Sequence, residues 1–279
     1  MTEQGSLIDI VKEYIASGKA ELPVFSSSAM RVQQELVKEE PNLQVLEKII
    51  SCDQSLSSQV LKIANSAFYK GLVEVATIKA AIVRLGMQEI GRIALLASAK
   101  NQFRSKNPTL NRMMKQLWQH SVGTALGAYW VSKRCKFDHL AGHAFFAGLL
   151  HDVGKLFVIV VLDQLKKQNK DLYITEALIL EAIESLHTEQ GYALMLRWNM
   201  PEQYCLVVRD HHTEEFDSKD MLLTIVRVAN MICIKIGIGP LHDPDLNPTN
   251  SLEVGLLNLS EIDIAEIEIM LEDTPTLAG

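Results

Sequence analysis

We expect an all-α protein, because three features of the sequence agree. Apolar residues recur at helical spacing along most of the chain, and residues that can cap helices precede several of these runs. No run alternates apolar and polar residues with period two. The dipeptides Asn-Gly and Asp-Gly, which mark tight β-hairpins, do not occur.

Residues 1–106 are predicted to form an N-terminal helical subdomain. Asn42 can cap one of its helices, and Thr77 can cap another that ends at Gly86. The expected inward positions of four successive helices are Leu43, Leu46, Ile49 and Ile50; Leu56, Val60, Leu61 and Ala64; Ile78, Ala81, Ile82 and Leu85; and Ile90, Ile93, Ala94 and Ala97.

The polar segment Arg104–Leu110, which contains Pro108, predicts a boundary between two helical bundles. We expect the second bundle at residues 107–240. The remaining residues 241–279 are predicted to be a loop and a C-terminal helix. The loop, Gly237–Asn250, is rich in Gly, Pro, Asp and Asn. Ser260, with Asp263 three residues later, can begin the helix, which contains Ile264, Ile267 and Met270.

Composition narrows the class of protein. The 279 residues are 48% hydrophobic, which is enough for a substantial core, and the net charge is -7. An acidic chain without a basic tail is a poor candidate for nucleic-acid binding, although folding could still gather a local basic patch. The four cysteines are far apart and are expected to be small core residues of a reduced, cytosolic protein: Cys52, Cys135, Cys205 and Cys233.

We expect a cytoplasmic protein with no membrane partner. The N-terminus lacks the basic-then-apolar order of a signal peptide. The most apolar stretch, Ala144–Leu162, is interrupted by His151, Asp152 and Lys155, so we do not interpret it as a membrane span.

The adjacent His151 and Asp152 are the most informative residues, because they end an apolar stretch that begins near Ala147. A carboxylate near a core is costly unless it has a partner. A metal ion, a salt bridge or a hydrogen-bond network could each supply one. Lys155, one turn further on, could contact a phosphate, or it could form a salt bridge or interact with a helix C-terminus.

Further histidines could join the pair. We expect each at a helix end or on a separate helix: His120 opening a helix over Ser121–Trp130, His187 after a helix over Glu176–Leu186, and His211 and His212 ending a helix that starts near Pro201. Helical proteins commonly build metal sites in this way, and imidazole and carboxylate ligands suit Fe, Mn, Zn or Ni. His139 and His143 are four residues apart, but Leu140 stands where a zinc protease would carry Glu, so we expect an exposed face there.

These residues resemble the HD superfamily of metal-dependent phosphohydrolases. His120 resembles the first His of that pattern, and His151 with Asp152 resembles its His-Asp pair. Histidines resembling His187, His211 and His212 occur in the two-metal cyclic-dinucleotide phosphodiesterases of the superfamily. The final Asp of the pattern is expected on a late apolar helix, where this chain carries Asn230.

The resemblance is closer to one branch, the HDOD domain (HD-related output domain), over Leu22–Gly239. It rests on a combination of segments: Leu22-Pro23, Ile63-Ala64-Asn65-Ser66-Ala67-Phe68-Tyr69, Ala80–Gly86, Trp118-Gln119-His120-Ser121 and Arg197-Trp198-Asn199-Met200-Pro201. This resemblance implies a bacterial signalling or output module, which often lacks demonstrated hydrolase activity.

Two departures from the hydrolase pattern bear on activity. Asn230 leaves Asp152 as the one carboxylate of the set, so two divalent ions would bring a surplus of about three positive charges unless an anion joined them. The residues after His211 and His212 read Thr213-Glu214-Glu215-Phe216-Asp217, without the Gly-Tyr-Pro of the cyclic-dinucleotide phosphodiesterases.

Two hypotheses of different classes remain. In the first, the chain is a regulatory module that binds another signalling protein or a phosphate-containing ligand. In the second, it is a metal-dependent phosphohydrolase in which the cation supplies a water nucleophile and polarises the phosphoryl oxygen. Asp152 and Lys155 would then be catalytic, and the predicted metal ligands are His120, His151, Asp152, His187, His211, His212 and Asn230.

Overall fold

The computed structural model describes residues 6–23, 26–36, 38, 40–65, 73–169 and 174–272. Within these ranges the chain forms helices joined by turns and loops, and no strand occurs, so the predicted all-α class is confirmed. Part of the Ile63–Tyr69 segment, from Ser66 onward, lies outside the described residues.

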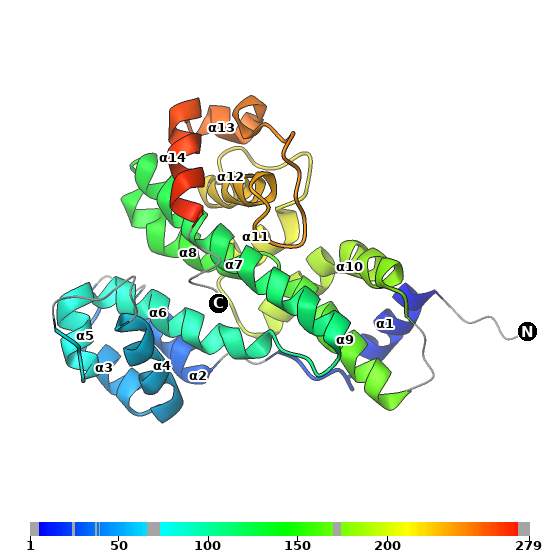
Figure 1. Ribbon diagram of the computed structural model, residues 1–279, viewed down its shortest axis with the longest axis horizontal. Coiled ribbons are helices and arrows are strands. Elements are labelled where there is room, and N and C mark those ends of the chain that lie inside the picture. Colours follow the sequence, from blue (N-terminus) through cyan, green and yellow to red (C-terminus); the bar gives the residue numbers. More distant parts are fainter. Residues whose placement is uncertain are drawn as a thin grey trace, which may run out of the picture. The chain divides into compact units, whose positions relative to one another are not determined.

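The chain divides into two compact units (Figure 1). One unit is Val24–Gln102, and the other joins Met1–Pro23 to Phe103–Gly279. This division differs from the expected ranges 1–106, 107–240 and 241–279 at the N-terminus, because helix α1 (Leu7–Ala16) packs against helices α9 (Val153–Gln168) and α10 (Glu176–Arg197).

The smaller unit is a bundle whose helix ends follow the predicted capping residues. The side chain of Asn42 accepts hydrogen bonds from the amides of Gln44 and Val45, and that of Thr77 accepts one from Ala80. Its helices are α2 (Ser27–Leu36), α3 (Leu43–Ser51), α4 (Gln54–Ala64), α5 (Ile78–Leu85) and α6 (Met87–Ala99), followed by a 3-10 turn at Lys100–Gln102. The predicted inward residues lie in or against one apolar core. Cys52 lies at the surface, which contradicts its expected core position.

The larger unit is arranged around helix α7 (Pro108–Arg134), which begins at the proline of the predicted boundary (Figure 1). The side chain of Asn107 caps it through the amide of Leu110. Helix α7 packs against α8 (Ala141–Leu150) and α12 (Met221–Lys235), while α9 packs against α10. Helix α11 (Glu202–Asp210) contacts α10, α12 and α8.

The C-terminal residues belong to this larger unit rather than to a separate one. Helices α13 (Leu252–Leu256) and α14 (Glu261–Leu271) pack against α12, and α14 also packs against α7. The predicted capping box of Ser260 and Asp263 is confirmed. Leu271 is buried at the end of α14, whereas Met270 is 40% exposed.

The most apolar part of the chain lies inside the larger unit. Among the described residues, one stretch, Asp138–Gln168, has the length and hydropathy of a membrane span, and 94% of its most apolar window is buried against the rest of the protein. It is interrupted between α8 and α9 by His151 and Asp152. These features are those of a core segment.

Candidate metal centre

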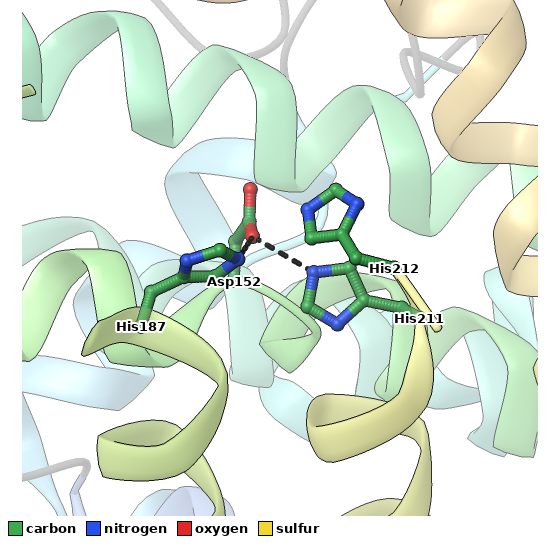
Figure 2. Close-up of side chains that lie close together, drawn as sticks. All are labelled: Asp152, His187, His211 and His212. Carbon is green, nitrogen blue, oxygen red and sulfur yellow. Dashed lines mark ion pairs between the residues drawn. The ribbon is translucent and has the colours of Figure 1, made fainter. Parts of the chain in front are cut away.

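The predicted site residues come together within the larger unit. His120 comes from the middle of α7, His151 and Asp152 from the junction of α8 and α9, and His187 from the middle of α10. His211 and His212 follow the last turn of α11. Figure 2 shows Asp152 with His187, His211 and His212 around it.

The positions of two histidines within their helices differ from expectation. His120 does not open a helix, because α7 runs continuously from Pro108 to Arg134. His187 does not follow a helix either, since α10 continues to Arg197. A single polar residue in an apolar run looks like a helix end in the sequence, but here it is an inward side chain within a helix.

Asp152 lies at the centre of the cluster, and its two carboxylate oxygens face different histidines. Oδ2 is 3.6 Å from Nε2 of His120 and 3.4 Å from Nε2 of His151. Oδ1 is 3.3 Å from Nε2 of His211 and 3.9 Å from Nε2 of His187. Two groups of ligand atoms therefore share one carboxylate. We call His120, His151 and Asp152 the first group, and Asp152, His187, His211 and His212 the second group.

The backbone fixes the orientation of four histidine rings. In each ring Nδ1 lies 2.8–3.0 Å from a carbonyl oxygen: His120 to Ile238, His151 to Gly148, His187 to Ile183 and His211 to Val208. A carbonyl can only accept, so Nδ1 carries the proton and donates it. Nε2 of each neutral ring is then a lone-pair acceptor directed at Asp152, which is the arrangement that metal-bound histidines usually have.

Several of these inward atoms have no hydrogen-bond partner among the described residues. They are Nε2 of His151, His187 and His211 and Oδ1 of Asp152, while Oδ2 of Asp152 has an ionic partner in the ammonium of Lys155. A buried polar atom without a partner costs about 1–3 kcal/mol, and Asp152 is only 1% exposed. A cation bound among acceptor atoms would satisfy all of them, so the residues present fit a metal ion.

The protonation states also suit a cation. Burial lowers the pKa of His120, His187 and His212, the last to about 3 although His212 is an exposed residue, and lowers that of His151 well below its ordinary value. Burial by itself raises the pKa of Asp152, but opposing influences, of which the ammonium of Lys155 is the largest, hold that pKa well below its usual range. The four histidines with lowered pKa values therefore present neutral imidazoles beside one carboxylate.

In the described part of the chain, the ammonium of Lys155 is the permanent cation paired with this carboxylate. Its Nζ lies 3.1 Å from Oδ2 of Asp152 and 4.0 Å from Oε1 of Glu184, and the residue is 6% exposed. Burial lowers the pKa of Lys155, but the two carboxylates outweigh that effect and raise it. Of the alternatives for Lys155, the structure has the salt bridge. The residue lies in the first turn of α9, not at a helix C-terminus.

Asn230 lies at the edge of the first group. It is 6% exposed on α12, and its side chain is within hydrogen-bonding reach of His120. Its amide oxygen could join His120 and His151 as a neutral ligand. Asp152 is thus the one carboxylate in either group among the described residues.

The predicted exposed face at His139 and His143 is confirmed for one of the two residues. His139 is exposed, as expected, but His143 is half-buried, and its Nδ1 lies 2.7 Å from the hydroxyl oxygen of Tyr204.

Sequence reasoning also missed Gly239, where a Cβ would lie 2.7 Å from Cβ of His120. The two glycines of the Gly237–Pro240 segment, which lies in the predicted loop, are the signal in the sequence for such a close approach.

Comparison with known proteins places the chain in a family. The profile of the HDOD domain matches residues 22–214, which begins where we expected and ends before the expected Gly239. An uncharacterised protein of Treponema pallidum (strain Nichols) is 24% identical over 227 residues, which are 78% of this chain and 43% of that protein. The uncharacterised protein YuxH of Bacillus subtilis (strain 168) is 35% identical over 81 residues, 29% of this chain and 20% of that protein. The chain thus covers less than half the length of these curated relatives.

Solved structures share the fold. An HDOD domain protein of unknown function from Geobacter sulfurreducens superimposes with a TM-score of 0.77 at 20% identity, covering 97% of this chain and 96% of that one. A proposed metal-dependent phosphohydrolase from Shewanella amazonensis SB2B gives 0.65 at 20% identity, covering 95% and 98%. A proposed signal transduction protein from Marinobacter aquaeolei VT8 gives 0.68 at 20% identity, covering 99% and 61%. With a family profile that matches most of its length and a fold shared with an HDOD domain protein, the chain belongs to the HDOD domain family.

Proposed function

We propose that the protein is a bacterial, cytoplasmic regulatory module whose His–Asp cluster binds a divalent metal ion. Its output would be the binding of another signalling protein or of a phosphate-containing ligand, without efficient hydrolysis. One observation carries this proposal. Five buried ligand atoms converge, and the two carboxylate oxygens among them both belong to Asp152. Asn230 stands where a hydrolase of the superfamily has a second carboxylate, that of Asp.

The kind of ion follows from the ligand atoms. Imidazole nitrogen with carboxylate oxygen suits Fe, Mn, Zn or Ni and is a poor set for Ca or Mg, which prefer oxygen ligands. The buried atoms without hydrogen-bond partners support binding of an ion from this group.

The charge of the loaded site favours an anionic ligand. One carboxylate cannot balance a divalent cation, and the ammonium of Lys155, 3.1 Å from Asp152, is itself offset by the carboxylate of Glu184 at 4.0 Å. A phosphate group would supply the missing negative charge and could accept hydrogen bonds from Lys155. We therefore propose a phosphate-containing compound as the small ligand.

A second candidate, a metal-dependent phosphohydrolase, is favoured by the sharing of Asp152 between the two ligand groups. A pair of cations supplies activation of water and charge stabilisation at phosphorus. Lys155 would neutralise and orient the phosphate. Asn230 weakens this candidate, because the first group would then hold an ion with one neutral amide in place of a second carboxylate.

A phosphoester panel with metal-loaded protein separates the two candidates. The panel would contain a phosphomonoester, a linear phosphodiester and a cyclic dinucleotide, each with Mn²⁺, Fe²⁺, Zn²⁺ or Ni²⁺. We expect turnover below about 1 per second on every compound. Asn230→Asp restores the carboxylate, and we expect this variant to bind an ion at the first group about tenfold more tightly than wild type. Asn250→Asp, which adds the same charge at an exposed turn, is the matched control.

Turnover at ordinary enzyme rates by the unmodified protein would exclude the regulatory proposal and favour the hydrolase. If Asn230→Asp and Asn250→Asp changed metal affinity equally, Asn230 would have no direct part in the first group.

A further inference from the structure

Arg227, on α12, contacts several groups of the larger unit at once. Its Nη1 donates to three backbone carbonyl oxygens, at 3.3 Å to Asp210, 3.0 Å to His211 and 2.8 Å to Thr213. Its guanidinium carbon lies 4.4 Å from the centre of the Phe216 ring. These contacts hold the turn that carries His211 and His212, two residues of the second group.

This turn needs a donor for a physical reason. The last carbonyls of an α-helix have no partner within the helix, and the helix dipole makes that end negative. A planar guanidinium can bind these carbonyls through Nη1 while its Nε is held by another group, whereas an ammonium carries all of its donors on one nitrogen. The ring of His211 is in turn held by the carbonyl of Val208 in the same turn, so the backbone sets the direction of Nε2.

Glu253, on α13, holds Arg227 from the other side. Its Oε1 lies 2.7 Å from Nε of Arg227, and the two side chains are 9% and 14% exposed. The planar guanidinium therefore has its orientation fixed by a buried carboxylate. Both residues lie beyond residue 214, where the match to the family profile ends.

We propose that Arg227 and Glu253 are a positioning pair that holds His211 and His212 in the geometry in which the second group can take a cation. The first group, His120, His151 and Asp152, has none of its ligands on this turn. The proposal rests on the metal-binding function proposed above. Its consequence is that disturbing the pair weakens metal binding at the second group and leaves metal binding at the first group unchanged.

The first experiment measures the uptake of Mn²⁺ by the full chain, with elemental analysis for stoichiometry and calorimetry for affinity. The variants are Arg227→Lys, which keeps the charge without the planar fork, and Glu253→Gln, which keeps the shape without the charge. The control is Arg134→Gln, which breaks the ion pairs of α7 with Asp263 and Glu266 on α14. It removes an arginine that also ties the C-terminal helices to the unit but does not contact the histidine turn.

We expect both test variants to bind an ion at the second group about 10- to 100-fold more weakly than wild type, because changes beside metal ligands commonly have this effect. The affinity of the first group for Mn²⁺ should change less than about threefold. Arg134→Gln should change the metal affinity of neither group. If wild type and Arg227→Lys bound Mn²⁺ at the second group with equal affinity, the positioning role would be overturned.

A second readout does not depend on metal. In metal-free protein, nitrogen NMR of the histidine rings reports which ring nitrogen carries the proton. We expect His211 to be the Nδ1–H tautomer in wild type and in Arg134→Gln, and a mixture of tautomers in Arg227→Lys. If wild type takes up no Mn²⁺, the proposed function fails, while the ring spectra still test the positioning pair. An unchanged His211 spectrum in Arg227→Lys would overturn the inference by itself.

Discussion

Asp152 shows how one buried residue determines the chemistry of a site. Its oxygens face four histidine nitrogens at 3.3–3.9 Å, and none of these distances is a short hydrogen bond. Neutral imidazoles whose lone pairs point at a carboxylate leave acceptors facing acceptors. Such an arrangement is stable only with a positive charge between them, and Lys155 supplies one on a single side.

The Lys155–Asp152 pair leads to a prediction about stability. Lys155→Met leaves a buried carboxylate without its cation, which typically costs about 3–5 kcal/mol of unfolding free energy. The metal-free protein should lose that amount in urea denaturation. Added Mn²⁺ should recover most of it, because the ion replaces the lost charge. Lys167→Met is the control, since Lys167 pairs with Asp163 while 61% of its own side chain is exposed, and should cost at most about 1 kcal/mol. A similar loss in both variants would show that Lys155 is not an essential counter-ion.

At the scale of elements, the site depends on how closely α9 and α10 approach each other. A Cβ added at Gly154 would lie 1.8 Å from the carbonyl oxygen of His187 and 2.8 Å from the amide nitrogen of Gly191. The helices therefore touch through backbone atoms at this point. The contact brings His187, from α10, within reach of Asp152, which directly precedes α9.

Gly154→Ala tests this close approach. The added methyl group must push α9 away from α10, so we expect a loss of about 1–3 kcal/mol or more in unfolding free energy together with weaker metal binding. Gly255→Ala is the control, because a Cβ at that helical position meets no atom within 4 Å. It should instead stabilise the protein by up to about 1 kcal/mol. Chemical denaturation of the two variants beside wild type gives the comparison. A neutral Gly154→Ala would mean that the two helices can separate without cost.

Helix ends could be predicted from the sequence where a capping side chain acts locally. Asn42, Thr77 and Ser260 each accept the hydrogen bonds expected of them. His120 and His187 could not be placed correctly, because whether a polar residue ends a helix or points inward from its middle is decided by the helices packed around it. The contact between α1 and α10 is of the same kind, since it joins residues far apart in the chain.

The candidate site could be predicted as a set of residues but not as a geometry. The His-Asp pair and the spacing of the other histidines indicated which residues are candidate ligands. The division of those ligands between the two oxygens of Asp152 depends on the relative rotation of α7, α10 and α11, which no local pattern contains. Arg227 was missed for the same reason, because its partners are backbone carbonyls.

For the whole molecule, the buried histidines predict a dependence of stability on pH. Their folded-state pKa values lie below the ordinary value of 6.5, so the unfolded chain takes up protons first as pH falls. Stability is then complete above about pH 6.5 and decreases below it, by up to about 1.4 kcal/mol per pH unit for each buried histidine. The carboxyl of Asp152, whose folded-state pKa lies well below 3.8, adds a further loss below about pH 4.

Urea unfolding of metal-free protein between pH 7.5 and pH 4 measures this dependence. Saturating Mn²⁺ should shift the onset of the loss to lower pH, because protons and the ion compete for the same imidazoles. Stability that stays constant from pH 7 to pH 5 would contradict the assignment of neutral, buried histidines.

The central claim, that the cluster around Asp152 binds a divalent metal ion, is tested most directly by the metal content of the purified protein. Protein grown in medium supplemented with Fe, Mn, Zn and Ni would be analysed by elemental mass spectrometry beside Asp152→Asn and His242→Ala, an exposed histidine outside both groups. We predict at least one ion per chain in wild type and in His242→Ala, and a background level in Asp152→Asn. Wild-type protein without metal, or Asp152→Asn with the wild-type content, would contradict the claim.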